Sequence, residues 1–230
     1  MASLLELALP VSFRVTSGMT NTYFRIYAIL FLSLVLLAAF VVYLGPTEAK
    51  ALMGETGPIE HASALGYFLC AGYMLLAGGR DFARKHSYIV VLVTLFGCRE
   101  LDFDKRFTTM GILKSRFYLS SEVPLLEKVI GLLVIALLLW AVISIVKNHL
   151  ISTLANLAKL NERAVGVVMI FVLLAVSKSI DGLARKLKPF GIETSQQVSF
   201  LASSVEEVME LGIPILMIAV FHSWLKSRTA

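Results

Sequence analysis

Long apolar blocks alternate with short polar segments along this chain, and the blocks have the length of membrane-crossing helices. A helix needs about 20 mostly apolar residues to cross the hydrocarbon layer of a bilayer. Several of the blocks end at glycine, proline or charged residues, as helices commonly do. We therefore predict an all-α fold, a polytopic transmembrane helical bundle of about six spans in a single integral membrane domain, 1–230. The predicted spans are 23–44, 59–78, 87–105, 126–146, 164–182 and 205–225.

The six predicted spans differ in their polar content. Spans 23–44 and 126–146 are apolar on all sides, which predicts that they form the outer wall and face lipid. The purely apolar run of the third span, 88–98, is only about half a bilayer long and leads into charged residues. A charge at membrane depth costs several kcal/mol unless it is paired or faces water, so such residues usually serve a function.

Most of this charge is predicted to gather at one face of the membrane. Because consecutive spans alternate in direction, the start of the second, the ends of the third and fifth, and the start of the sixth share one side. Helical spacing then places charged residues on single faces, as for Arg99, Asp102 and Arg106, or for Lys178, Asp181 and Arg185. The second, third, fifth and sixth spans are thus predicted to build one polar site.

The segment 103–125, which follows the third span, interleaves aromatic and cationic residues. Such a stretch suits the headgroup zone, where aromatic rings anchor and cations approach phosphate. One interpretation is a cradle for an acidic lipid head, because cations near the membrane surface attract anionic lipid. The other interpretation is an ordinary interfacial loop.

Composition supports a membrane environment and excludes some functions. Hydrophobic residues make up 57% of the chain and charged residues only 16%, which is more apolar than an ordinary soluble domain. The net charge of +5 is modest, and no soluble basic domain exists, so nucleic acid is not expected as a partner. Cys70 and Cys98 fall inside apolar segments and are predicted to be buried thiols. The four histidines are scattered, which disfavours a zinc centre.

The first functional hypothesis is an enzyme that acts at the membrane surface on a lipid or lipid-linked anionic head group. Carboxylates and His61 would supply acid–base chemistry or bind a divalent metal, the cofactor that this set of side chains suggests. The candidate catalytic residues are Glu60, His61, Glu100, Asp102, Asp181, Glu206, Glu207 and Glu210. The candidate residues for binding the anionic group are Arg99, Arg106, Lys114, Arg116, Lys178 and Arg185.

Two other hypotheses use the same residues. In the second, the protein is a transporter or an ion- or proton-conducting protein whose carboxylates bind and pass cations. In the third, it is a non-catalytic membrane subunit whose charges only pair with one another and hold the helices in register. The sequence leaves the choice open, together with the binding of a metal and the oligomeric state. Membrane lipids are the expected partners in all three.

The orientation rests on the distribution of basic residues. Cytoplasmic loops carry an excess of Lys and Arg, but the two sides of this chain are nearly balanced. If the basic residues of 99–128 and 178–188 belong to the site, the remaining loop on that side, 45–58, has only Lys50. We therefore predict a multi-pass protein of the cell inner membrane with both termini in the cytoplasm and the site facing outward.

Overall fold

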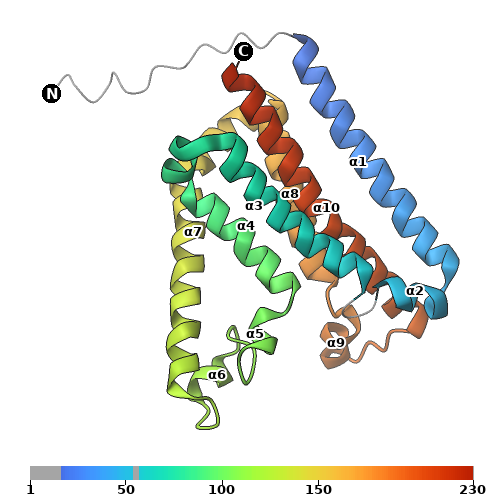
Figure 1. The fold of residues 1–230 in the computed structure, drawn as a ribbon. Helices are drawn as coiled ribbons and strands as arrows, with labels where there is room; N and C mark the ends of the chain where they lie inside the picture. Colours follow the sequence, from blue (N-terminus) through green and yellow to red (C-terminus); the bar gives the residue numbers. More distant parts are fainter. Residues whose placement is uncertain (1–16, 54–56, 230) are drawn as a thin grey trace.

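The computed structural model describes residues 17–53 and 57–229 and contains only helices, turns and short connections over these ranges. The all-α prediction is therefore confirmed for this part of the chain. The α-helices are α1 (Ser17–Leu44), α2 (Pro46–Met53), α3 (Pro58–Lys85), α4 (Ser87–Glu100), α5 (Phe103–Arg106), α6 (Ser115–Leu119), α7 (Leu125–Leu157), α8 (Glu162–Ile180), α9 (Leu183–Leu187) and α10 (Gln196–Thr229). Figure 1 shows the long helices side by side, with the short ones at one end.

Five of these helices are long and apolar enough to cross a membrane, and they correspond to five of the six predicted spans. Their apolar stretches are Thr22–Leu44, Pro58–Lys85, Leu125–Leu157, Glu162–Ile180 and Gln196–Arg228. Most of these stretches extend beyond the predicted spans, because the helical backbone continues into the polar ends. Their length and composition are those of a multi-pass membrane protein.

The second predicted span ends at a break in α3. Gly79 has a φ of +71°, a conformation that glycine adopts without steric cost, and the backbone there is not helical. The helix resumes after this residue and continues to Lys85. The predicted boundary at residue 78 therefore coincides with a real interruption.

The third predicted span, 87–105, is wrong in extent. The helix α4 ends at Glu100, and Asp102 takes a left-handed conformation with a φ of 51° before α5 begins. At 14 residues, α4 is about 21 Å long, which is less than the roughly 30 Å of a hydrocarbon layer. The count of six spans therefore stays a prediction.

The predicted interfacial segment, 103–125, folds against the start of α7. The backbone N–H of Thr109 donates a hydrogen bond of 2.7 Å to Glu127, and the Lys128 ammonium donates one of 2.7 Å to the Ser120 carbonyl. The fully buried ring of Phe117 lies against Gly131, where a Cβ atom would come within 2.9 Å of it. The segment is thus an ordered cap on α7.

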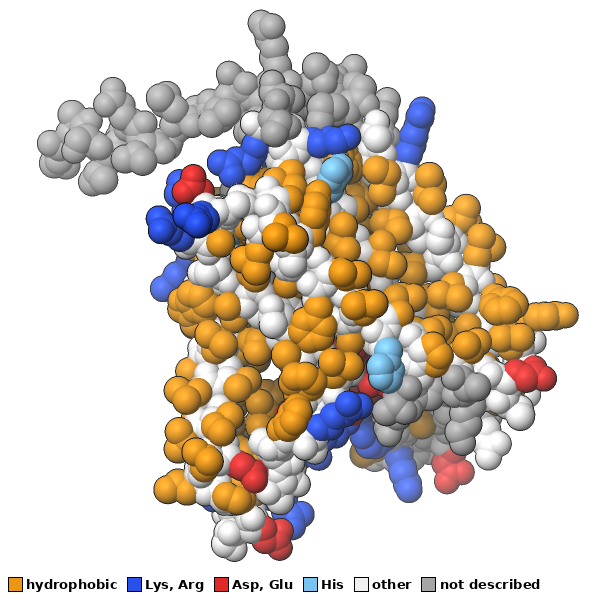
Figure 2. Space-filling model, viewed as in Figure 1, with side chains coloured by type: hydrophobic (Ala, Val, Ile, Leu, Met, Phe, Trp, Pro, Cys, Tyr) orange, Lys and Arg blue, Asp and Glu red, His pale blue; other side chains and the backbone are white. Residues whose placement is uncertain are grey.

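The core lies around α10, which packs against α1, α3 and α8, while α3 also packs against α4. Tyr67 and Ile213 are among the most buried side chains. In contrast, only 11% of the residues in the apolar stretches of α1 and α7 are buried, in agreement with their predicted place in the outer wall. Figure 2 shows a broad hydrophobic band between two ends where charged side chains gather.

Candidate functional site

The ammonium group of Lys178 lies among three carboxylates near the end of α8. Its Nζ atom is 2.9 Å from Glu210 Oε1, 3.3 Å from Asp181 Oδ2 and 3.9 Å from Glu206 Oε1. Glu206 and Glu210 share one face of α10 because they are four residues apart. Asp181 follows directly after α8 and bends back to the same ammonium group. One cation therefore joins α8 to α10.

A second cation, Arg99, reaches the same site from the end of α4. Its guanidinium lies 3.8 Å from Glu210 Oε1 and 4.0 Å from Glu100 Oε1. The hydroxyl of Ser177 also donates a hydrogen bond of 3.2 Å to Glu210 Oε1. Glu210 is thus the shared partner of three side chains from two other helices, and it is itself buried.

Further carboxylates surround Glu210. Glu207 lies within electrostatic range of Glu210, Glu206, Glu100 and Glu60. Glu60 comes from the first turn of α3, so this helix also contributes. We call this group the carboxylate cluster; it consists of Glu60, Arg99, Glu100, Lys178, Asp181, Glu206, Glu207 and Glu210.

The carboxylate cluster has an excess of acids, with six carboxylates and two cations. Both cations are already paired, Arg99 with two carboxylates and Lys178 with three. At its edge, partial burial of Asp181 opposes ionisation, but the nearby charges of Lys178 and Lys186 outweigh it and lower the pKa of Asp181 below its ordinary value. Asp181 is therefore an anion at neutral pH.

Several predicted site residues lie outside the cluster. Asp102 pairs with Lys105 of its own turn at 2.8 Å, and the Nδ1 atom of His61 hydrogen-bonds the Gly57 carbonyl at 2.9 Å. Arg185 lies on α9, next to Gly182. Over the described residues, no ion pair joins Arg106, Lys114 or Arg116 to the cluster.

These differences arise because the residues that were predicted to share a helical face do not all belong to one helix. Arg99, Asp102 and Arg106 do not share one helical face, because α4 ends at Glu100 and Asp102 reverses the chain. Likewise, α8 ends at Ile180, and Gly182 has a left-handed φ of +59° that starts α9 in a new direction. Helical spacing predicts a shared face only within one helix, so the prediction failed for the residues beyond these helix ends.

Two residues next to the cluster were not among the sequence candidates. Ser177 is the hydrogen-bond donor to Glu210 described above. Tyr67 is almost fully buried and lies within electrostatic range of Glu100 and Glu210. Its position seven residues after Glu60 places both on one face of α3, which is the only signal in the sequence that points to it.

The arrangement does not offer a recognisable metal centre. Over 17–53 and 57–229, no three His, Cys, Asp or Glu side chains are grouped so that they could hold a metal ion. Glu100, Asp181, Glu206 and Glu210 instead pair with the two cations. A divalent metal therefore gains no support from the geometry of these residues.

The turn after α8 adds cations beside the cluster. The Lys186 ammonium donates a hydrogen bond of 2.6 Å to the carbonyl of Lys178, which ties α9 back to the end of α8. Arg185 and Lys188 flank it, and all three side chains belong to exposed residues. The carboxylate cluster thus lies next to a small cationic turn.

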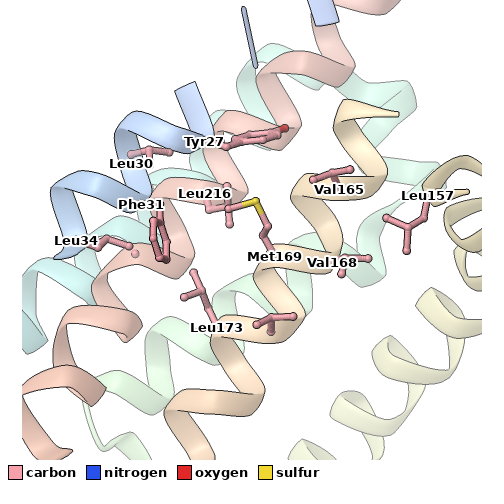
Figure 3. A pocket seen from close by; sticks show the side chains of 12 residues that line it. Tyr27, Leu30, Phe31, Leu34, Leu157, Val165, Val168, Met169, Leu173 and Leu216 are labelled. Atoms are coloured by element: carbon pink, nitrogen blue, oxygen red, sulfur yellow. The ribbon is translucent and has the colours of Figure 1, made fainter. Parts of the chain in front are cut away.

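A separate apolar hollow lies between α1, α8 and α10. It has a volume of about 240 Å³ and is lined by aliphatic, aromatic and Met side chains, among them Leu30, Val168 and Leu216. Figure 3 shows these side chains, with Tyr27 at one end of the hollow. The lining carries none of the residues of the carboxylate cluster, so the hollow is a different feature.

No protein-family model, curated protein or solved structure matches this chain. The function is therefore inferred from the chain's own residues.

Proposed function

We propose that this protein binds protons or small cations at the carboxylate cluster and carries them as a membrane transporter or ion-conducting protein. The observation that supports this is the charge balance, six carboxylates against two cations that are both already paired. A group of side chains with this excess attracts cations and repels anions. An anion could bind here only if Arg99 or Lys178 left its carboxylate partners, and these buried carboxylates would then lack a compensating charge.

The surroundings of the cluster favour proton exchange in particular. Lys178 lies 16 residues after the start of α8, which is about 24 Å along the helix and less than the roughly 30 Å of a hydrocarbon layer. Ser177 and Tyr67 place hydroxyl groups beside the carboxylates. A proton needs no large cavity, and such groups can pass it between oxygen atoms.

A second candidate is an enzyme that acts on a lipid or lipid-linked anionic head group. The cationic turn supports it, because Arg185, Lys186 and Lys188 are exposed directly next to the cluster. In this version the cationic turn holds the anionic group, and the cluster carboxylates act as general acid and base. Arg99 and Lys178 then position carboxylates instead of binding the substrate.

The same proposal includes the membrane topology. We propose six passes, with the short α4 as the third, in the cell membrane, with both termini in the cytoplasm and the cluster facing outward. The start of α1 and the end of α10 lie at one end of the bundle (Figure 1), which supports an even number of passes. The lipids around the long helices are then the constant partners of the protein.

Glu207 is the best residue for the test. Its electrostatic neighbours are carboxylates, and over the described residues it has no ion pair, so its replacement removes acid without breaking a salt bridge. The full chain is reconstituted into liposomes that contain a pH-sensitive dye, and a pH gradient is applied. We expect the wild type to pass protons and Glu207→Gln to fall to the level of empty vesicles.

Glu193→Gln is the matched control, because Glu193 is an exposed carboxylate on the connection that leads into α10. It should leave the flux unchanged, and both variants should keep the wild-type melting temperature. If wild-type vesicles pass no protons, Na⁺ or K⁺, the transport proposal is wrong. Turnover of a bacterial lipid extract that Glu207→Gln abolishes would then favour the enzyme, and a wild type without such turnover would favour a structural role for the ion pairs of the cluster.

A further inference from the structure

Another buried carboxylate lies at the end of the bundle opposite the carboxylate cluster. Glu162 is the first residue of α8, and its side chain is turned into the bundle, where the residue is only 6% exposed. The side chain of Asn161 accepts a hydrogen bond from the Arg163 backbone N–H and so fixes the start of the helix at this point. The fully buried hydroxyl of Ser223, on α10, donates a hydrogen bond of 3.1 Å to Glu162 Oε1.

Two polar atoms here are buried without a partner among the described residues. One is the second carboxylate oxygen of Glu162, Oε2, and the other is the hydroxyl of Tyr27 on α1. Tyr27 is only 2% exposed and lies within electrostatic range of Glu162. Leaving a buried polar atom without a hydrogen bond is costly, so two of them within electrostatic range of each other call for a bound group that satisfies both.

We infer that Glu162, Tyr27 and Ser223 form a second proton-binding site, in which a water molecule joins Glu162 Oε2 to the hydroxyl of Tyr27. On proton uptake, a hydronium ion from this face transfers its proton to Oε2, which becomes a neutral carboxylic acid, and water remains. On release, water takes the proton back and the carboxylate is restored. The site rests on the proposed function in one respect: it would be the second end of the proton route.

The groups around Glu162 connect this site to the surface. Tyr23 of α1 lies within electrostatic range of both Glu162 and Tyr73 of α3. The hydroxyl of Tyr73 is 2.6 Å from Nδ1 of His222, which is exposed on α10. On α8, Arg163 donates a hydrogen bond of 3.1 Å to Ser227 of α10 and is the nearby cation. The hydroxyl groups of Tyr23 and Tyr73 and the imidazole of His222 are thus the polar groups through which we propose that Glu162 exchanges protons with solvent.

The apolar hollow between α1, α8 and α10 is not part of the proposed proton route to Glu162. Tyr27 lines it, but the hydroxyl is buried and would approach a Cβ atom on Gly166 to 2.7 Å, so it is turned towards α8. The rest of the lining is apolar, as the labelled side chains in Figure 3 show. The proposed proton route to Glu162 therefore starts at the end of the bundle, on the side of Tyr23 and Tyr73.

Infrared difference spectroscopy tests the site directly. The full chain in lipid vesicles is titrated with acid, and the carboxylic C=O stretch is recorded in H₂O and D₂O. We expect a band from protonated Glu162 that disappears in Glu162→Gln. In Tyr27→Phe the band should remain but shift in frequency, because the hydrogen bond to the carboxylic acid changes.

A matched control variant shows whether the change in the infrared band is specific to the site or follows from any tyrosine substitution in this helix. Tyr43→Phe alters an exposed tyrosine on the same helix as Tyr27 and should leave the band unchanged. If the spectrum of Glu162→Gln equals that of the wild type, the inference is overturned. If Glu162→Gln does not fold, Tyr27→Phe still decides, since an unshifted band would contradict the proposed water bridge.

The flux assay distinguishes this inference from the proposed function. A vesicle preparation without proton flux but with the Glu162 band would refute transport and leave the second site standing. Flux that Glu207→Gln abolishes, in a protein without the Glu162 band, would support transport and refute the second site. Flux together with the band, slowed in Glu162→Gln, is the result expected if both are correct.

Discussion

At the residue scale, Lys178 holds the carboxylate cluster together. Its Nζ atom contacts Glu210, Asp181 and Glu206, which come from two segments of the chain. Glu210 is buried, so the loss of its nearest cation leaves a carboxylate that water cannot solvate well. The side chain of Lys178 is 37% exposed, which moderates the cost because solvent partly screens the charge.

We therefore predict that Lys178→Met destabilises the protein by about 1–3 kcal/mol, the range for leaving a buried hydrogen-bonding group without its partner. Methionine keeps most of the side-chain length and removes only the ammonium group. Denaturant unfolding in detergent micelles, followed by circular dichroism, measures the change. Lys188→Met, an exposed lysine of the cationic turn, should change stability by less than about 0.5 kcal/mol, and equal effects of the two variants would contradict the prediction.

At the element scale, close packing of α3 against α10 depends on one glycine. A Cβ atom on Gly66 would come within 2.9 Å of the ring of Pro214, and that ring cannot rotate away. Small residues let helices approach closely in membranes, where packing rather than hydrophobic burial drives their association. Pro214 is fully buried in this contact, which joins two of the helices that carry the carboxylate cluster.

The two glycines of α3 should therefore respond oppositely to alanine. Gly66→Ala is expected to lower the melting temperature, because the added methyl group forces α3 and α10 apart. Gly72→Ala should raise stability by up to about 1 kcal/mol, because nothing lies within 4 Å of its Cβ position and alanine favours the helix. Melting curves of the two variants in the same detergent measure the difference, and a destabilised Gly72→Ala would argue against this packing.

The element scale is also where prediction from the sequence was most uneven. Apolar length identified five long helices, because a bilayer requires about 20 apolar residues whatever they pack against. The end of α4 was missed, because the pattern of apolar residues does not indicate the left-handed backbone conformation of Asp102. The error carried over to Asp102 and Arg106, which had been assigned to the face of Arg99.

At the scale of the whole molecule, polar groups occupy two ends of a hydrophobic bundle. The carboxylate cluster lies at one end, and Glu162 lies about 22 Å away from Ser177 along α8. Figure 2 shows the hydrophobic band that separates the charged ends. The proposed topology assigns the cluster end to the outside and the Glu162 end to the cytoplasm.

Single-cysteine labelling should confirm this orientation. In a variant with Cys70→Ser and Cys98→Ser, a cysteine at Ser120, in the cap on α7, is expected to react with a membrane-impermeant maleimide on intact cells. A cysteine at Lys159, between α7 and α8, should react only after the membrane is opened. The reversed pattern would place the cluster in the cytoplasm, and labelling of both from outside would contradict the membrane-spanning α7.

The sequence by itself determined the helical class and the long apolar elements. These follow from local composition, since the bilayer sets the length of a helix and the 3.6-residue period sets its faces. Only the tertiary structure decided which charges meet. Arg99 and Lys178 converge on Glu210 because α4 and α8 end beside α10. The pairing of Glu162 with Ser223 joins residues 61 positions apart, and such a contact depends on how helices pack, which no local pattern encodes.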